Sequence, residues 1–354
     1  MHLNKAYAED AVILNENEEV ATTATSEEPA TEAIYSGFYC PSMMDIMKEA
    51  SKLPPTRKLY KELWHENEVC LLFSSQGMGK TILAMQIAEK LSQTDKVCYL
   101  DFELSLRQVY GRYSNEAGEY PFDPKFYRPD MRVEEIMSEE EAERRIFRHI
   151  QFMAEERGCK IFVIDNITYL TSKLENGTVM VKLMKKLSLM KKKYGLSILI
   201  LGHVRKKPRR EPLEADQLAG SKKIMNFVDS AFAIGCSIND NKLLYIKQIK
   251  VRECECMYGA DNVILCRAEK DDNFLQLAEH GYSTEEAMLS KDNGNHSKAA
   301  MVDKIITMKS GGMSNRTIAK ELKISEGTVR NYLKDTSIKP LDVPLVWHNA
   351  NADA

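Results

Sequence analysis

The fold is decided by the stretch VCLLFSSQGMGKT at residues 69–81. Five apolar residues, Val69 to Phe73, form a run typical of a strand that is buried on both faces, and two glycines then interrupt the chain. A helical pattern follows at 81–92, with apolar residues at helical spacing. A buried strand, a glycine-rich turn and a helix in this order predict one unit of a mostly parallel sheet.

Strands and helices continue to alternate downstream of this unit. The apolar runs are 97–100, 161–164 and 197–201, and the helical patterns are 138–157 and 179–194. After Asp229 the pattern changes to strand-like segments separated by turn residues, which predicts antiparallel hairpins. These segments are 230–235, 242–250, 262–267 and 274–277. The predicted fold class is α/β, with a mostly parallel sheet covered by helices on both faces and antiparallel strands at its C-terminal end.

Charge is distributed unevenly along the chain. The 354 residues include Lys+Arg 49 and Asp+Glu 52, a formal net charge of -3, and this length predicts roughly two domains. Residues 1–34 contain eight carboxylates and one lysine, so this segment carries -7 and the remainder +4. The composition of the segment predicts a disordered acidic tail. A solvated tail and a DNA-mimicking or autoinhibitory tail both stay open.

The hydrophobic and cysteine patterns exclude a membrane protein. The longest apolar runs are far too short to span a bilayer, and no basic-then-apolar leader opens the chain. The eight cysteines fall mostly inside strand-like runs, which is typical of reduced thiols. We therefore predict a cytoplasmic protein with no membrane partner.

Residues 74–81, SSQGMGKT, resemble the P-loop pattern G-x-x-x-x-G-K-[ST], with Ser74 in place of the first glycine. Glycines let backbone N–H groups wrap around phosphate oxygens, and the N-terminus of the next helix adds a positive dipole. The resemblance implies ATP and Mg²⁺ as cofactors, with Lys80 on the β- and γ-phosphates and Thr81 as a metal ligand. A glycine-rich turn that only caps a helix is the alternative. The predicted nucleotide-binding residues are Ser75, Gln76, Gly77, Met78, Gly79, Lys80, Thr81 and Ile82.

Two carboxylates complete the predicted catalytic centre. The strand KIFVID at 160–165 ends in Asp165, the form of a Walker B segment, and implies a carboxylate that holds Mg²⁺ through water. Asn166 follows, so no second acid stands there, but Glu103 lies just past the strand after the P-loop helix. This arrangement resembles the RecA-like ATPases, including RepA- and DnaB-type hexameric helicases, in which such a glutamate polarises the attacking water. The alternatives are a turn cap for Asp165 and a helix N-terminal acid for Glu103.

Further segments fit the same family, and the resemblance spans residues 61–277. His203 ends a strand at the position of a γ-phosphate sensor, and LAGS at 218–221 is similar to the stretch that follows the sensor in RepA-like ATPases. Lys250 and Arg252 form a K-x-R pair, which in RecA-like hexamers reaches the nucleotide of the neighbouring subunit. The pair therefore implies a homo-oligomer such as a hexamer. A solvated basic strand end is the alternative.

A basic segment follows the predicted sensor. Residues 204–210, VRKKPRR, hold five bases, at the place where RecA-like proteins have a mobile loop that faces single strands in ring motors. The resemblance implies contacts to phosphates without base reading, and an unbound charged loop is the alternative. The predicted contacts are Arg205, Lys206, Lys207, Arg209 and Arg210.

The C-terminal part resembles the helix-turn-helix of resolvases and response regulators over residues 314–333. Ser314 and Ser325 would each cap a helix, and residues 297–340 hold nine bases and four acids, which suits duplex DNA. The predicted core is Ile318, Ala319, Leu322, Ile324, Val329 and Leu333. The predicted DNA contacts are Thr328, Arg330, Asn331 and Lys334. A module for protein contact is the alternative.

These inferences predict six segments: an acidic tail 1–34, a lead-in helix and loop 35–60, an ATPase domain 61–282, a linker 283–296, a helix-turn-helix 297–337 and a C-terminal tail 338–354. The resemblance implies a DNA-acting ATPase for replication or mobilisation of a mobile element, with helicase activity as its specific form. An ATP-switched DNA-binding regulator without motor activity is the main alternative. A phosphotransferase of the KaiC kind is a weaker one, because no Ser/Thr target motif is apparent.

Overall fold

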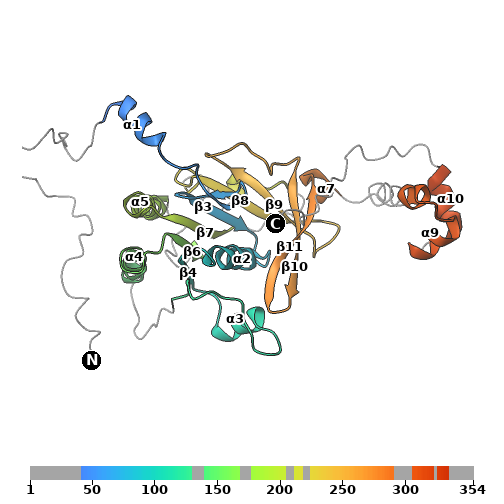
Figure 1. Cartoon of the computed structure of the whole chain (residues 1–354), viewed down its shortest axis with the longest axis horizontal. Helices are drawn as coiled ribbons and strands as arrows, with labels where there is room; N and C mark the ends of the chain where they lie inside the picture. Colours follow the sequence, from blue (N-terminus) through green and yellow to red (C-terminus); the bar gives the residue numbers. More distant parts are fainter. Residues whose placement is uncertain are drawn as a thin grey trace, which may run out of the picture. The chain divides into compact units, whose positions relative to one another are not determined.

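The protein is described by a computed structural model for residues 41–129, 139–167, 177–204, 211–217, 224–290, 305–322 and 325–334. Its largest feature is a nine-stranded sheet in the order β11-β10-β9-β8-β3-β7-β6-β4-β5 (Figure 1). The strands are β3 Val69–Ser74, β4 Val97–Asp101, β5 Phe126–Tyr127, β6 Ile161–Asp165, β7 Ser197–His203, β8 Ser230–Cys236, β9 Leu244–Lys250, β10 Val263–Asp271 and β11 Phe274–Ser283. A separate two-stranded sheet pairs β1 Lys58–Tyr60 with β2 Trp64–His65.

The pairing of the strands confirms the predicted fold class. The strands β8, β3, β7, β6, β4 and β5 pair in parallel, whereas β8, β9, β10 and β11 pair in an antiparallel manner. Apart from the two-residue strand β5, the parallel strands are nearly continuous apolar runs, because alternate residues face opposite layers. In β3, Cys70 and Leu72 belong to one hydrophobic cluster, and Leu71 and Phe73 belong to the other.

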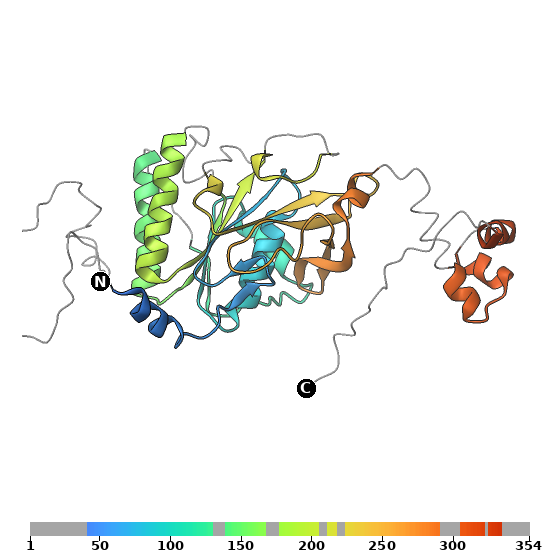
Figure 2. The same ribbon diagram turned by 90° about the horizontal axis from the view of Figure 1, so that it is seen from above.

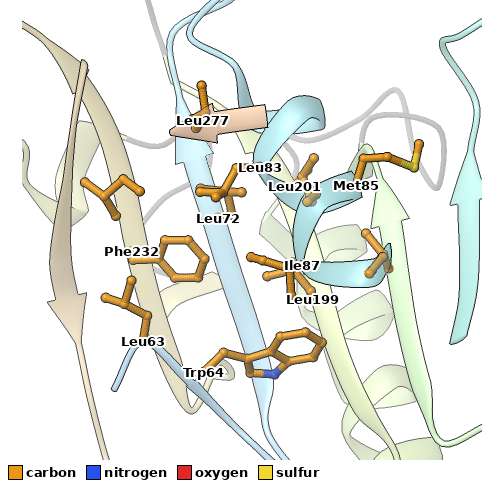
Figure 3. Packing of buried hydrophobic residues seen from close by; sticks show 14 of the residues in the cluster. Leu63, Trp64, Leu72, Leu83, Met85, Ile87, Leu199, Leu201, Phe232 and Leu277 are labelled. Carbon is orange, nitrogen blue, oxygen red and sulfur yellow. The ribbon is translucent and has the colours of Figure 1, made fainter. Parts of the chain in front are cut away.

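Helices cover both faces of the sheet. On one face, α2 (Lys80–Ser92) packs Leu83 and Ile87 near Leu72 and Leu201 (Figure 3). On the other face, α4 (Glu139–Glu155) and α5 (Gly177–Tyr194) lie side by side (Figure 2). The remaining helices of this part are α3 Leu106–Tyr113, the 3-10 turn η2 Ala215–Gln217 and α7 Glu285–Leu289.

A helix, α7, lies inside the segment 283–296 that the sequence predicts to be a linker. The α7 helix begins at Glu285, which is buried and accepts hydrogen bonds from the Leu213 backbone N–H (2.7 Å) and from Lys247 Nζ (2.5 Å). These contacts tie α7 to β9 and to the segment 211–217. The predicted tails 1–34 and 338–354 lie outside the described residues.

The N-terminal part of the described chain holds one helix, α1, Met43–Ala50. Ser42 caps it by accepting a hydrogen bond from the Asp45 backbone N–H, and none of its residues is buried. Within the described segments, no helix is both long and apolar enough to cross a membrane.

The C-terminal helical part contains a helical stretch at 305–310, α9 Asn315–Glu321 and α10 Glu326–Lys334. The predicted caps are present, because Ser314 and Ser325 accept hydrogen bonds from the Thr317 and Thr328 backbone N–H groups. The core of this part is Ile305, Ile318, Ala319 and Val329, with Met308 and Leu322 packed against it.

The prediction that Leu333 belongs to this core is wrong. The residue is 38% exposed, whereas Val329, one turn earlier in α10, is buried. Ile324 lies outside the described residues.

One glycine is required by the packing between β8 and β9. A Cβ on Gly235 would lie 2.3 Å from Cζ of Tyr245, its cross-strand neighbour, whose side chain is 1% exposed. We expect Gly235→Ala to lower the free energy of unfolding by about 1–3 kcal/mol, as overpacking does in buried sites. Urea denaturation measures this change. Gly111→Ala is the matched control, because a Cβ there meets nothing within 4 Å, and equal losses in both variants would contradict the prediction.

Candidate functional site

The sheet brings the C-terminal ends of four parallel strands to one edge. Ser74 at the end of β3 is level with His203 at the end of β7, and Asp101 at the end of β4 is level with Asp165 at the end of β6. In open α/β sheets this edge is where ligands bind. The predicted P-loop, Glu103, Asp165 and His203 therefore meet in one place.

The loop after β3 has the backbone of an anion site. Gly77 and Gly79 have φ angles of 79° and 81°, in the left-handed region that glycine adopts without strain. Gly79 is the N-cap of α2 and provides no side-chain cap, so the first N–H groups of the helix stay available to a ligand. A Cβ on Gly79 would lie 3.2 Å from Leu277 Cδ2, so the side chain of Leu277 in β11 packs closely against the loop at Gly79.

Lys80 is held inside this loop. Its Nζ lies 3.1 Å from the Ser74 carbonyl oxygen, 3.2 Å from the Ser75 carbonyl oxygen and 3.0 Å from His203 Nδ1. Burial lowers the pKa of Lys80 to about 8, although the charges of Asp165 and Glu103 act in the opposite direction. A phosphate ligand would supply the negative charge that this buried ammonium group needs.

Asp165 is a buried carboxylate, 1% exposed. The Tyr99 hydroxyl donates a hydrogen bond to its Oδ2 over 2.8 Å. Burial raises the pKa of Asp165 to about 6, while hydrogen bonds from Thr81 and Tyr99 lower it. A carboxylate and a threonine hydroxyl are hard oxygen donors, so Thr81 and Asp165 fit a Mg²⁺ ion, Asp165 through a water molecule. When bound there, the ion would neutralise charge on the phosphates.

Glu103 lies at the more open side of the site, with its side chain 40% exposed. Its position follows from Asp101, whose Oδ1 accepts the backbone N–H groups of Glu103 and Leu104, both at 2.9 Å. Arg128 forms an ion pair with the same aspartate at 2.9 Å. The carboxylate of Glu103 accepts a hydrogen bond from Asn166 Nδ2 and lies 3.7 Å from His203 Nε2. Access to water and a fixed backbone suit a group that activates water.

Sequence reasoning missed four residues of this site: Tyr99, Asp101, Arg128 and Asn166. Asn166 follows Asp165 directly and Asp101 lies two residues before Glu103, so their positions in the sequence could have identified them as site residues. Tyr99 resembled an ordinary buried strand residue, and Arg128 follows the two-residue strand β5, which has no pattern of its own.

The structure does not bring Lys250 and Arg252 to this edge. Lys250 is level with Ala231 at the beginning of β8, which is the opposite edge of the sheet. Its Nζ donates hydrogen bonds to the Met225 and Val228 carbonyl oxygens, and Arg252 pairs with Asp229 at 2.9 Å. Lys250 is therefore bound to its own chain, whereas the Arg252 side chain is 57% exposed. The contact of this pair with a neighbouring subunit stays a prediction.

The predicted DNA contacts are only partly described. The five bases between 205 and 210 lie outside the described residues, as do residues 218–223 and the side chains of Asn331 and Lys334. Arg330 is exposed and forms an ion pair with Glu326 at 2.7 Å, and Thr328 Oγ1 lies 2.8 Å from Ser325 Oγ. An exposed ion pair of this kind is weak and leaves Arg330 accessible.

Two family models match the chain. Residues 41–209 match the model described as AAA domain, and residues 304–339 match bacterial regulatory proteins of the luxR family. No curated protein matches the chain significantly. Among solved structures, the KaiC-like protein of the hyperthermophilic archaeon Pyrococcus horikoshii is 16% identical, with a TM-score of 0.46 over 63% of this chain and 100% of that chain. The first match contains every residue of the phosphate site described above, and the second contains α9 and α10.

Proposed function

We propose that this chain, which joins a RecA-like P-loop ATPase domain to a luxR-type helix-turn-helix, hydrolyses ATP in order to act on DNA. The observation that carries the proposal is the meeting of Lys80, Asp165, Glu103 and His203 at one sheet edge. An ammonium group for the phosphates, a buried carboxylate for the metal ion and an exposed carboxylate for water are groups that P-loop ATPases use in phosphoryl transfer, and an imidazole can donate to a phosphate oxygen.

Each residue has a role that its surroundings support. Lys80 and the N–H groups of the loop would bind the phosphates, and Thr81 and Asp165 would hold a metal ion that neutralises phosphate charge. Glu103 orients and polarises the attacking water, because its carboxylate is fixed and exposed. His203 contacts the γ-phosphate once Lys80 has turned to the nucleotide. In-line attack of water then gives ADP and phosphate.

We propose that the helix-turn-helix directs this activity to DNA. In our proposal the basic segment 204–210 contacts single strands, and the protein serves replication or mobilisation of a mobile element as an oligomer. The second candidate is a DNA-binding regulator that ATP switches without motor activity. The match to bacterial regulatory proteins of the luxR family favours this second candidate.

Steady-state ATP turnover without DNA, with single strands and with duplex tests the proposal. Acceleration by single strands supports a motor that moves on DNA. A rate that DNA leaves unchanged, together with tight duplex binding, supports the regulator. The absence of turnover under all three conditions would show that the chain is not an ATPase.

Duplex affinity is expected to follow the C-terminal part. Deleting residues 290–354 removes α9 and α10 but keeps α7, so we expect weaker duplex binding and a smaller salt dependence. The slope should fall by about 0.9 for each lost phosphate contact. Fluorescence anisotropy at several salt concentrations measures it, and basal ATP turnover is the control for folding. An unchanged slope would identify the helix-turn-helix as a module for protein contact.

A further inference from the structure

Asn166 connects two residues of the proposed catalytic centre. It follows Asp165 at the end of β6, is 2% exposed, and presents Nδ2 to both Glu103 Oε1 and His203 Nε2, the latter at 3.1 Å. On the far side of the imidazole, Nδ1 lies 3.0 Å from Lys80 Nζ. A continuous series of polar contacts therefore runs from the phosphate-binding loop to the group proposed to activate water. Its members are Lys80, His203, Asn166 and Glu103.

The donors and acceptors in this series of contacts determine the amide orientation of Asn166. The ionised carboxylate of Glu103 can only accept, so the amide must turn its NH₂ group toward it. The reverse orientation would bring the amide oxygen against a carboxylate oxygen. With NH₂ in this position, its second hydrogen points to His203 Nε2, which must then accept.

Two donors compete for the tautomer of His203. Burial and the charge of Lys80 lower the pKa of His203, against the effect of Glu103, and a neutral ring has one acceptor nitrogen only. The Lys80 ammonium group requires the acceptor at Nδ1, whereas the Asn166 amide requires it at Nε2. When a phosphate ligand draws Lys80 away, the Asn166 amide is the remaining donor, so the ring proton lies on Nδ1. The Nδ1–H group can then donate to a phosphate oxygen.

We propose that Asn166 is a positioning residue that sets the tautomer of His203 and the orientation of Glu103 together. The contact to the γ-phosphate and the activation of water are thereby coupled through one amide. This inference rests on the proposed ATPase function and adds to it a residue that acts through Glu103 and His203.

Nitrogen NMR of the full-length protein labelled with ¹⁵N-histidine tests the tautomer without any turnover. The His203 signals are assigned by their loss in His203→Gln. With a non-hydrolysable ATP analogue bound, we expect the pattern of a ring protonated at Nδ1 in the wild type and the pattern of a ring protonated mainly at Nε2 in Asn166→Ala. The same tautomer in both proteins would overturn the proposal.

Kinetics test the effect on Glu103. We expect Asn166→Ala to lower kcat by about 10²-fold, the loss that a misplacement of about 1 Å produces, and to change the Kd of a non-hydrolysable ATP analogue by less than about threefold. Asn166→Leu keeps a similar volume and adds no charge but removes both donors, so it should behave in the same way. The matched control is Asn262→Leu, at an exposed asparagine whose Nδ2 donates to the Met257 carbonyl oxygen.

A double-mutant cycle separates positioning from a structural role. In the Glu103→Gln background, single-turnover measurements should show that Asn166→Ala costs at least about tenfold less than in the wild type, because the group it positions is already gone. Equal losses in both backgrounds would make Asn166 a structural residue at the end of β6. If the wild type shows no turnover, the proposed function fails, but the NMR result still decides the inference.

Discussion

Lys80→Ala is expected to abolish nucleotide binding, with a loss in affinity of about 10²-fold or more. The variant removes a charge-assisted contact to phosphate, a class of hydrogen bond that contributes roughly 1.5–3 kcal/mol each. Equilibrium titration with a fluorescent ATP analogue measures the loss. Lys90→Ala, at the exposed last turn of the same helix, is the control.

Thermal unfolding distinguishes this loss from misfolding. Burial lowers the pKa of Lys80, which means that the charged group is disfavoured in its empty site. Alanine should therefore leave the melting temperature unchanged or raise it. Weak binding together with a lower melting temperature would instead indicate damage to the fold, and affinity like that of the wild type would remove Lys80 from the phosphate site.

Glu103→Gln is expected to keep nucleotide binding and to lower kcat by about 10²- to 10⁴-fold. The amide keeps the size and the polar contact of the side chain but cannot polarise water as a carboxylate does. Turnover at saturating ATP and binding of the analogue are measured on the same preparation. Glu116→Gln, an exposed acid beyond α3, is the control. Unchanged turnover in Glu103→Gln would assign the activation of water to another group.

Burial on both faces explains why the main strands were predictable. A strand such as β6 is apolar at every position until Asp165, so its sequence marks both the strand and the polar residue at its end. The short elements had no such pattern. The strands β1, β2 and β5 have two or three residues each, which is too short for a pattern. The partner of β5 is β4, which is also distant in sequence.

Contacts between strands explain what the sequence left undetermined in the site. The sequence shows that Asn166 is uncharged and follows Asp165, but it does not predict the contacts of Asn166 to Glu103 and His203. Those contacts form because β4, β6 and β7 lie near one another in the sheet. The sequence also predicts that Lys250 ends a strand. Its strand runs antiparallel to β8, and this reversal places the residue at the edge away from the phosphates.

Leu277 joins the phosphate-binding loop to the antiparallel half of the sheet. Its side chain packs against the loop at Gly79, and its backbone N–H donates to Gln86 Oε1 of α2 over 3.0 Å. One residue of β11 therefore contacts both the loop and the helix that follows it, so the antiparallel strands act as a brace that keeps the loop in its binding shape.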